Sequence, residues 1–147
     1  MAVIESSPHH PHHSYGLPSF DGSKLLVQLR DELATERLIR LLRPTGISVV
    51  SARSAEVLLE RLRSERPDVV ACDLELPDGD GMHLVRRIRM RSRLEGGATP
   101  AIALTSEPTR QAHTRALLAG FQAYVRPDAL ELCLALAQVM TDRGRQN

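Results

Sequence analysis

The chain has 147 residues and a formal net charge of +1, from 19 Lys and Arg against 18 Asp and Glu. This length suits one domain with a hydrophobic core and leaves no room for a second domain of ordinary size. The balanced charge lacks the polycationic bias of a nucleic-acid binder, so we expect no direct nucleic-acid binding. No apolar run approaches the roughly 18 residues of a membrane span, and the N-terminus lacks a signal-peptide pattern. A cytoplasmic location is therefore expected.

The two ends of the chain are polar. Residues 1–23 are rich in His, Pro, Ser and Gly without apolar periodicity, which predicts a disordered tail. Residues 141–147, TDRGRQN, are expected to form a disordered C-terminal end. The predicted domain therefore covers residues 24–140. Within it, Cys72 and Cys133 lie in apolar segments and are expected to be buried free thiols.

From Lys24 onward, short apolar runs alternate with stretches of helical period. Such alternation is typical of consecutive βα units around a parallel sheet, whose strands are nearly continuously apolar because both faces are covered. The five predicted strands are 25–29, 47–51, 69–72, 101–104 and 122–125. The sequence therefore predicts an α/β fold, a (βα)5 doubly wound parallel sheet.

The intervening helices are indicated by apolar faces and by their ends. Ser54 is placed to cap the second helix, and Gly46, Pro67 and Gly120 mark exits from helices. The apolar faces are Leu38, Ile39, Leu41 and Leu42; Val57, Leu58, Leu59 and Leu62; Leu84, Val85 and Ile88; Ala116, Leu117 and Leu118; and Leu130, Leu132, Leu134 and Leu136.

The residues directly after the strands carry the chemistry. In an open parallel sheet, ligands bind beyond the carboxyl ends of the strands, where the strand order reverses. Four positions there are Arg30, Asp73, Thr105 and Arg126. A carboxylate, a hydroxyl and two guanidiniums at one sheet edge are suited to a phosphoryl group, which the carboxylate accepts and the others hold.

Three segments resemble the response-regulator receiver family. PDVVACDLELPDGDGMHLVRRIR (67–89) is similar to its phosphoacceptor region, PAIALTS (100–106) to its fourth strand, and AYVRP (123–127) to the end of its fifth. The resemblance covers roughly residues 24–140 and implies a flavodoxin-like sheet of strand order 2-1-3-4-5. It also implies that Asp73 is the phosphoacceptor, Thr105 the switch hydroxyl and Tyr124 the switch aromatic.

The chain departs from the family pattern at the metal site. The family ends its first strand with two adjacent acidic residues that hold magnesium, and here those positions fall on Leu29 and Arg30. Magnesium needs hard oxygen ligands, which neither side chain supplies, so no cofactor is expected. A two-residue slip is the alternative, and it would leave Mg²⁺ to Asp31 and Glu32 together with Asp73 and Glu75.

A second departure replaces the family's lysine before the fifth-strand proline by Arg126, with the chain one residue shorter there. Arginine is bulkier, planar and always charged, so the exchange is not neutral. We therefore hypothesise that Arg30 and Arg126 flank Asp73 and take the place of the metal's charge. The site would then be locked in one state.

Two functions fit these observations. The preferred one is a stand-alone degenerate receiver, a phosphorylation-independent protein-interaction module; the alternative is a conventional receiver phosphorylated on Asp73 by a histidine kinase. No second catalytic dyad or phosphate-binding glycine loop is visible, so an independent enzyme is not expected.

The expected partner is a signalling protein, either a histidine kinase or an output protein. It would dock on the fourth helix, fifth strand and fifth helix. Residues 128–140 hold more apolar positions than one buried stripe needs, which predicts that some are exposed for a partner or for a homodimer.

Overall fold

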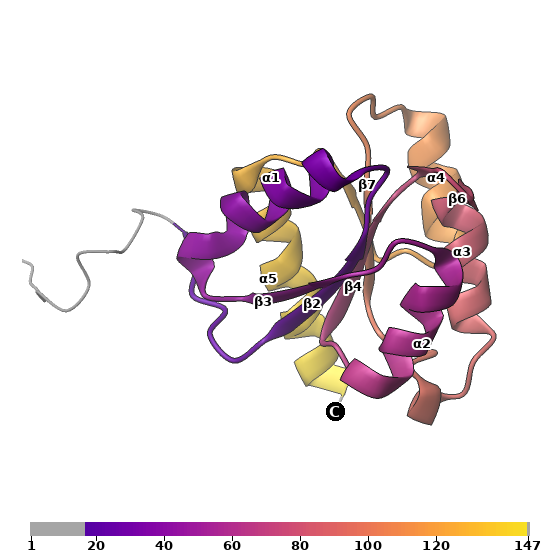
Figure 1. Cartoon of the computed structure of the whole chain (residues 1–147), viewed down its shortest axis with the longest axis horizontal. Helices are drawn as coiled ribbons and strands as arrows, with labels where there is room; N and C mark the ends of the chain where they lie inside the picture. The colour runs from indigo at the N-terminus through magenta and orange to yellow at the C-terminus, as the bar shows by residue number, and fades with distance from the viewer. Residues whose placement is uncertain (1–16, 147) are drawn as a thin grey trace, which may run out of the picture.

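The computed structural model describes residues 17–146 as a parallel sheet covered by helices on both faces (Figure 1). The strands of the sheet are β2 (Lys24–Gln28), β3 (Ser48–Ser51), β4 (Val69–Asp73), β7 (Ala101–Leu104) and β8 (Ala123–Val125). Their order is β3-β2-β4-β7-β8, and every neighbouring pair is parallel. This is the predicted flavodoxin-like order 2-1-3-4-5.

Five α-helices connect and follow the strands. They are α1 (Glu32–Leu42), α2 (Ala55–Glu65), α3 (Gly81–Arg89), α4 (Arg110–Ala119) and α5 (Ala129–Gln146). Two 3-10 turns, η1 (Arg43–Thr45) and η2 (Arg93–Glu95), follow α1 and α3. A short antiparallel hairpin of β5 (Glu75–Leu76) and β6 (Gly79–Asp80), which the sequence did not predict, lies between β4 and α3.

The two faces of the sheet carry separate apolar clusters, because alternate side chains of a strand point to opposite faces. Leu25 and Val27 of β2 pack with α1 and α5, whereas Leu26 packs with α2, α3 and α4. The same alternation in β4 sends Ala71 to the first cluster and Cys72 to the second. Both cysteines are buried and free, as predicted.

Local signals in the sequence explain where the helices begin and end. The Ser54 hydroxyl accepts a hydrogen bond from the Val57 N–H at 3.1 Å, which confirms the predicted cap of α2. Gly46 ends η1 with a φ of 81°, a conformation that glycine adopts without steric cost. In α4, however, Leu117 and Leu118 are exposed, and Ala116 and Ala119 form its buried side.

Both predicted boundaries of the domain need correction. Residues 1–16 of the expected tail lie outside the described residues, but Phe20 is only 7% exposed and packs in the cluster of α1 and α5. Its N–H donates to the Thr45 carbonyl at 2.6 Å, so the ordered chain begins before Lys24. At the other end α5 continues through the polar sequence after Met140 and ends at Gln146.

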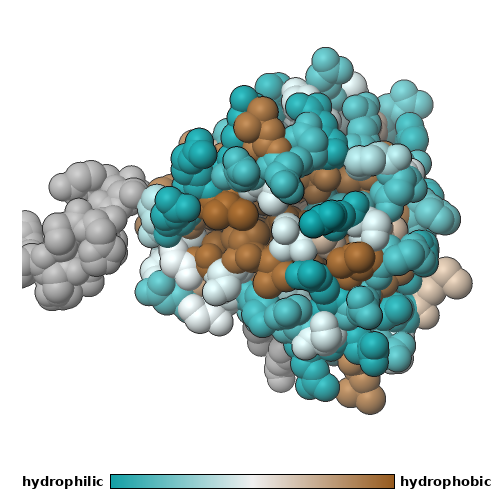
Figure 2. Space-filling model, in the orientation of Figure 1, coloured by the Kyte–Doolittle hydropathy of each residue, from teal (hydrophilic) through white to brown (hydrophobic). Residues whose placement is uncertain are grey.

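The edges of the sheet are open. Strand β3 has a neighbour on one side only, and its residues are exposed or half-buried. The side of the molecule drawn in Figure 2 has patches of apolar surface between largely hydrophilic side chains. None of the helices in the described part of the chain combines the length and apolar character that a membrane span requires.

Candidate functional site

Asp73 ends β4, at the carboxyl edge of the central strand. Its side chain is half-buried, and its Oδ2 accepts a hydrogen bond of 2.7 Å from the backbone N–H of Arg30. Arg30 follows β2, the neighbour of β4, so the parallel register brings these two residues to one edge as predicted. The contact uses the Arg30 backbone rather than its guanidinium.

The loop after Asp73 is folded back tightly. A Cβ on Gly81 would collide with the backbone oxygen of Asp73, so only glycine fits where α3 begins. Asp80 caps that helix by accepting a hydrogen bond from the His83 N–H at 2.7 Å. Asp80 and Gly81, which belong to the segment that resembles the phosphoacceptor region, therefore both have a structural role at the start of α3.

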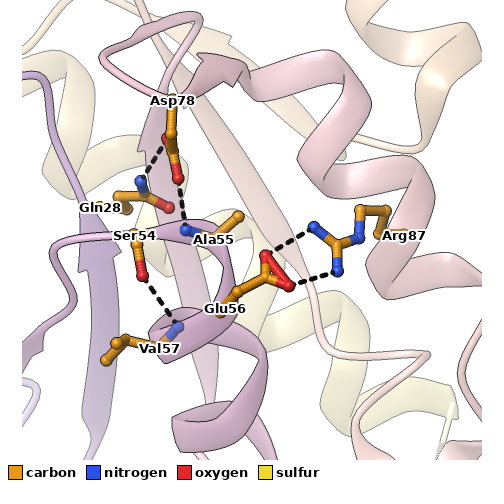
Figure 3. Close-up of polar contacts among 7 residues, drawn as sticks. All are labelled: Gln28, Ser54, Ala55, Glu56, Val57, Asp78 and Arg87. Atoms are coloured by element: carbon orange, nitrogen blue, oxygen red, sulfur yellow. Dashed lines mark hydrogen bonds and ion pairs between the residues drawn. The ribbon is translucent and has the colours of Figure 1, made fainter.

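Asp78 fastens the tip of this loop to two other elements (Figure 3). Its Oδ1 accepts from the Gln28 side-chain amide at 3.1 Å, and its Oδ2 accepts from the Ala55 N–H, at the first turn of α2, at 2.7 Å. Nearby, Glu56 and Arg87 join α2 to α3 through two hydrogen bonds of 3.0 and 3.1 Å. Asp78 thus holds the loop between β4 and α3 against β2 and α2.

Gln28 is a polar residue that follows three apolar residues, Leu25, Leu26 and Val27, at the end of β2. It is fully buried, and its Oε1 has no hydrogen-bond partner among the described residues. Such an atom is costly, but the amide N–H is needed by Asp78. The only signal in the sequence was a glutamine within the apolar run LLVQL, and we did not predict a role for Gln28 or Asp78.

Thr105 directly follows β7, and Tyr124 lies in β8, the next strand of the sheet. The Thr105 hydroxyl accepts from the Glu107 N–H at 3.2 Å, and the Tyr124 hydroxyl accepts from the Thr109 N–H at 3.1 Å. The Tyr124 ring also contacts the His113 ring at a centroid distance of 5.1 Å. Tyr124 is therefore attached to the first turn of α4.

The predicted arginine clamp on Asp73 is wrong. The Arg126 guanidinium lies 4.0 Å from Glu131 Oε2, and its backbone N–H donates to Glu131 Oε1, so it faces the start of α5. The Arg30 Nε lies 3.8 Å from Asp31 Oδ2, and this side chain is 61% exposed. Within the described residues neither guanidinium is within 4 Å of Asp73, because each has a carboxylate closer along the chain.

Burial dominates the electrostatics of Asp73. Removal from water raises the pKa of its carboxyl group, and the Arg30 N–H and charge oppose the rise only in part. The carboxylates of Asp31 and Glu75 raise the pKa further. The adjacent Cys72 is a buried core residue, and burial raises the pKa of its thiol, which disfavours the thiolate that a nucleophile needs.

The residues present do not fit a magnesium ion held as in the family pattern. Leu29 is buried in the core, and Arg30 offers a backbone N–H, a donor, where a metal needs an acceptor. The alternative set of Asp31, Glu32, Asp73 and Glu75 is not assembled, since no three acidic, His or Cys side chains of the described chain form a metal-binding group. Asp31 instead caps α1 by accepting from the Ala34 N–H.

A cleft of about 470 Å³ brings the site residues together. Asp73, Thr105 and Tyr124 all line it, as do Leu29 and Arg30, whereas Arg126 does not. The lining also includes Arg37 and Leu38 of α1, which were not predicted as site residues. Three predicted site residues therefore share one cavity, and the predicted replacement for lysine lies outside it.

Comparison with known proteins gives a consistent result. The family model described as "Response regulator receiver domain" matches residues 30–129. The response regulator MprA of Mycolicibacterium vanbaalenii is 31% identical over 121 residues, which are 82% of this chain and 51% of that protein. The chain therefore spans about half the length of this relative.

Two solved structures have the same fold. A response regulator structure from Chloroflexus aurantiacus has a TM-score of 0.73 and 28% identity, covering 81% of this chain and 98% of that one. The receiver domain of a Pseudomonas aeruginosa sensor histidine kinase, solved with magnesium coordinated in its active-site cleft, has a TM-score of 0.71 and 24% identity. It covers 82% of this chain and 98% of that chain.

Proposed function

This chain belongs to the response regulator receiver domain family, and from that premise we propose that it works as a degenerate receiver, which docks a signalling partner without phosphorylation of Asp73. Receiver domains are signalling modules of two-component systems and not classical enzymes. The proposal concerns how this member of the family works.

The contact between Arg30 and Asp73 carries the proposal. Acceptance of a phosphoryl group by a carboxylate crowds negative charge, which needs a cation to compensate it. Here the position beside Asp73 holds a backbone N–H, and the guanidiniums of Arg30 and Arg126 face other carboxylates. A single hydrogen bond supplies much less compensation than a divalent ion, so phosphoryl transfer to Asp73 is unfavourable.

A conventional receiver is the second candidate, because Asp73, Thr105 and Tyr124 share one cleft. In that function a histidine kinase would donate the phosphoryl group to Asp73, and Thr105 would bind one of its oxygens. Magnesium, which the P. aeruginosa receiver coordinates, would have to bind through Asp73 and Glu75 with water filling the remaining positions.

The proposed docking surface is formed by α4, β8 and α5. Strand β8 is an edge strand, and the surface leucines of both helices are exposed, which leaves apolar area and unpaired backbone groups together. The exposed leucines are Leu117, Leu118, Leu130 and Leu134. A histidine kinase, an output protein or a second copy of the chain would cover this surface.

Incubation with acetyl phosphate tests the proposal. The full chain and Asp73→Asn would be incubated with and without Mg²⁺, and phosphorylated protein would be separated on a phosphate-affinity gel. We expect no Mg²⁺-dependent band in either protein. A band that requires Mg²⁺ and disappears in Asp73→Asn would establish the conventional receiver instead.

A variant with the acidic pair gives a positive control. Leu29→Asp combined with Arg30→Asp restores the two carboxylates of the family pattern beside Asp73. If the missing ligands are the cause, this variant gains a Mg²⁺-dependent band that the parent chain lacks. A folded double variant that stays unmodified would show that another feature prevents phosphorylation.

A further inference from the structure

The cleft beside Asp73 is larger than a phosphoryl group requires. Its volume of about 470 Å³ lies within the range of roughly 300 to 1,000 Å³ that is typical of small-molecule sites. Its lining includes Asp73 and Thr105, residues of α1 as far as Leu41, and Pro127 before α5. This leaves space for an organic molecule of several heavy atoms.

The inner part of the cleft is apolar. Leu29, Leu38 and Leu104 are buried core residues that also line it, and Ala34 and Ala112 add small side chains. The half-buried Ala34, Leu41 and Ala112 provide a surface for an apolar body, whose transfer from water is favourable at roughly 25 cal/mol per Å². The small alanines keep that space open.

Carboxylates outnumber guanidiniums among the residues that line the cleft. The carboxylates of Asp73, Glu75 and Glu107 line it together with the guanidiniums of Arg30 and Arg37. Arg30 forms an ion pair with Asp31, which is not among the lining residues. The balance of charge in the cleft therefore favours a cation over an anion.

Asp73 offers the hydrogen-bond acceptor that such a cation needs. Its Oδ2 accepts from Arg30, and its Oδ1 has no partner in the described part of the chain. Burial raises the pKa of this carboxyl group because removal from water disfavours its charged form, and a neighbouring cation would oppose that effect. Arg126, which follows β8, faces Glu131 and leaves the position beside Asp73 open.

We propose that the cleft binds a small organic amine, with its ammonium group on Asp73 and its apolar body along Ala34, Leu41 and Pro127. The proposal rests on the proposed function in one respect, that Asp73 carries no phosphoryl group. Because the ligand would contact Thr105 and Tyr124, and Tyr124 is bonded to Thr109, the amine would act on the first turn of α4. That turn belongs to the docking surface.

The test is a titration of the full, unphosphorylated chain with benzylamine, followed by amide chemical shifts. Benzyl alcohol and benzoate serve as probes of the same shape without the charge or with the opposite one. We expect saturable shifts at the lining residues with a dissociation constant of about 1 mM, as for other fragments of this size. Both matched probes should bind at least about tenfold more weakly.

Three variants locate the binding. Asp73→Asn should weaken benzylamine at least about tenfold, since it removes the charge and keeps the shape. Ala34→Leu should also weaken it by filling the cleft, whereas Glu95→Gln, an exposed carboxylate outside the cleft, should change nothing. Spectra of the free variants show whether each is folded.

Several outcomes would overturn the proposal. They are the absence of shifts, equal or tighter binding of benzoate, and full affinity in Asp73→Asn. These results are independent of the phosphorylation test, because the titration uses unphosphorylated protein. If acetyl phosphate does modify Asp73, the proposed function fails, but benzylamine should still bind the unmodified chain and be lost on phosphorylation.

Discussion

At the scale of single residues, the environment of Asp73 decides its chemistry. A carboxylate at the end of a parallel strand is ordinary, but this one is half-buried beside Glu75 and Asp31 and receives a single N–H. Its raised pKa means that the folded protein binds this proton more tightly than the unfolded chain does. The free energy of unfolding therefore loses a contribution as the pH rises through the raised pKa.

We expect Asp73→Asn to stabilise the protein at pH 7 by about 0.5 kcal/mol, a small value because half-exposed charges are screened by solvent. The gain should disappear near pH 3, where Asp73 is protonated in both states. Urea denaturation at the two pH values measures it, with Glu95→Gln as a matched exposed control. A variant that is less stable than the parent at pH 7 would contradict this account.

At the scale of elements, Arg89 joins three segments that are distant in sequence. Its guanidinium donates to the carbonyls of Gly97, Thr99 and Gly120 at 2.7 to 3.0 Å and to the side chain of Gln122 at 2.8 Å. No carboxylate takes part, and burial lowers the pKa of this arginine. Arg89 thus holds α3 to the ends of η2 and α4.

Arg89→Met should lower the free energy of unfolding by about 2 to 3 kcal/mol, because several carbonyls lose a charged donor in a partly buried site. Arg86→Met on the same helix, where the side chain is exposed, should change it by less than about 0.5 kcal/mol. Urea denaturation of both variants makes the comparison. Equal changes in the free energy of unfolding would show that the positive charge of α3, and not the hydrogen bonds of Arg89, determines this contribution to stability.

At the scale of the whole molecule, α5 packs one side on the core and leaves its other side, which is also apolar, at the surface. Leu132 and Leu136 are fully buried, whereas Leu130 and Leu134 are 64% and 62% exposed. This confirms the prediction that the helix holds more apolar residues than its buried face needs. The exposed pair is available to a partner, and the buried pair is not.

Leu134→Glu should therefore keep the fold within about 0.5 kcal/mol of the parent and abolish self-association through α5, if it occurs. Leu132→Glu should cost about 4 kcal/mol or more, because it buries a charge in the core. Circular dichroism and size-exclusion chromatography distinguish the two effects. Similar unfolding of both variants would place Leu134 in the core.

Much of this molecule follows from local sequence. The strands, the Ser54 cap and the position of Asp73 before a glycine-bounded loop were predicted correctly, because apolar period, capping and steric limits act between near neighbours in the chain. The strand order followed from the family resemblance. The hairpin of β5 and β6 was missed, since two-residue strands leave no periodic signal.

The sequence by itself determined the elements, their caps and which residues end the parallel strands. Only the tertiary structure decided where the long side chains point: Arg126 to Glu131, Arg30 to Asp31, Asp78 to Gln28 and Phe20 into the core. These directions depend on partners that folding brings together and on competition among several carboxylates for each cation. A flexible side chain has many rotamers, and neither its sequence position nor its charge selects one before the fold exists.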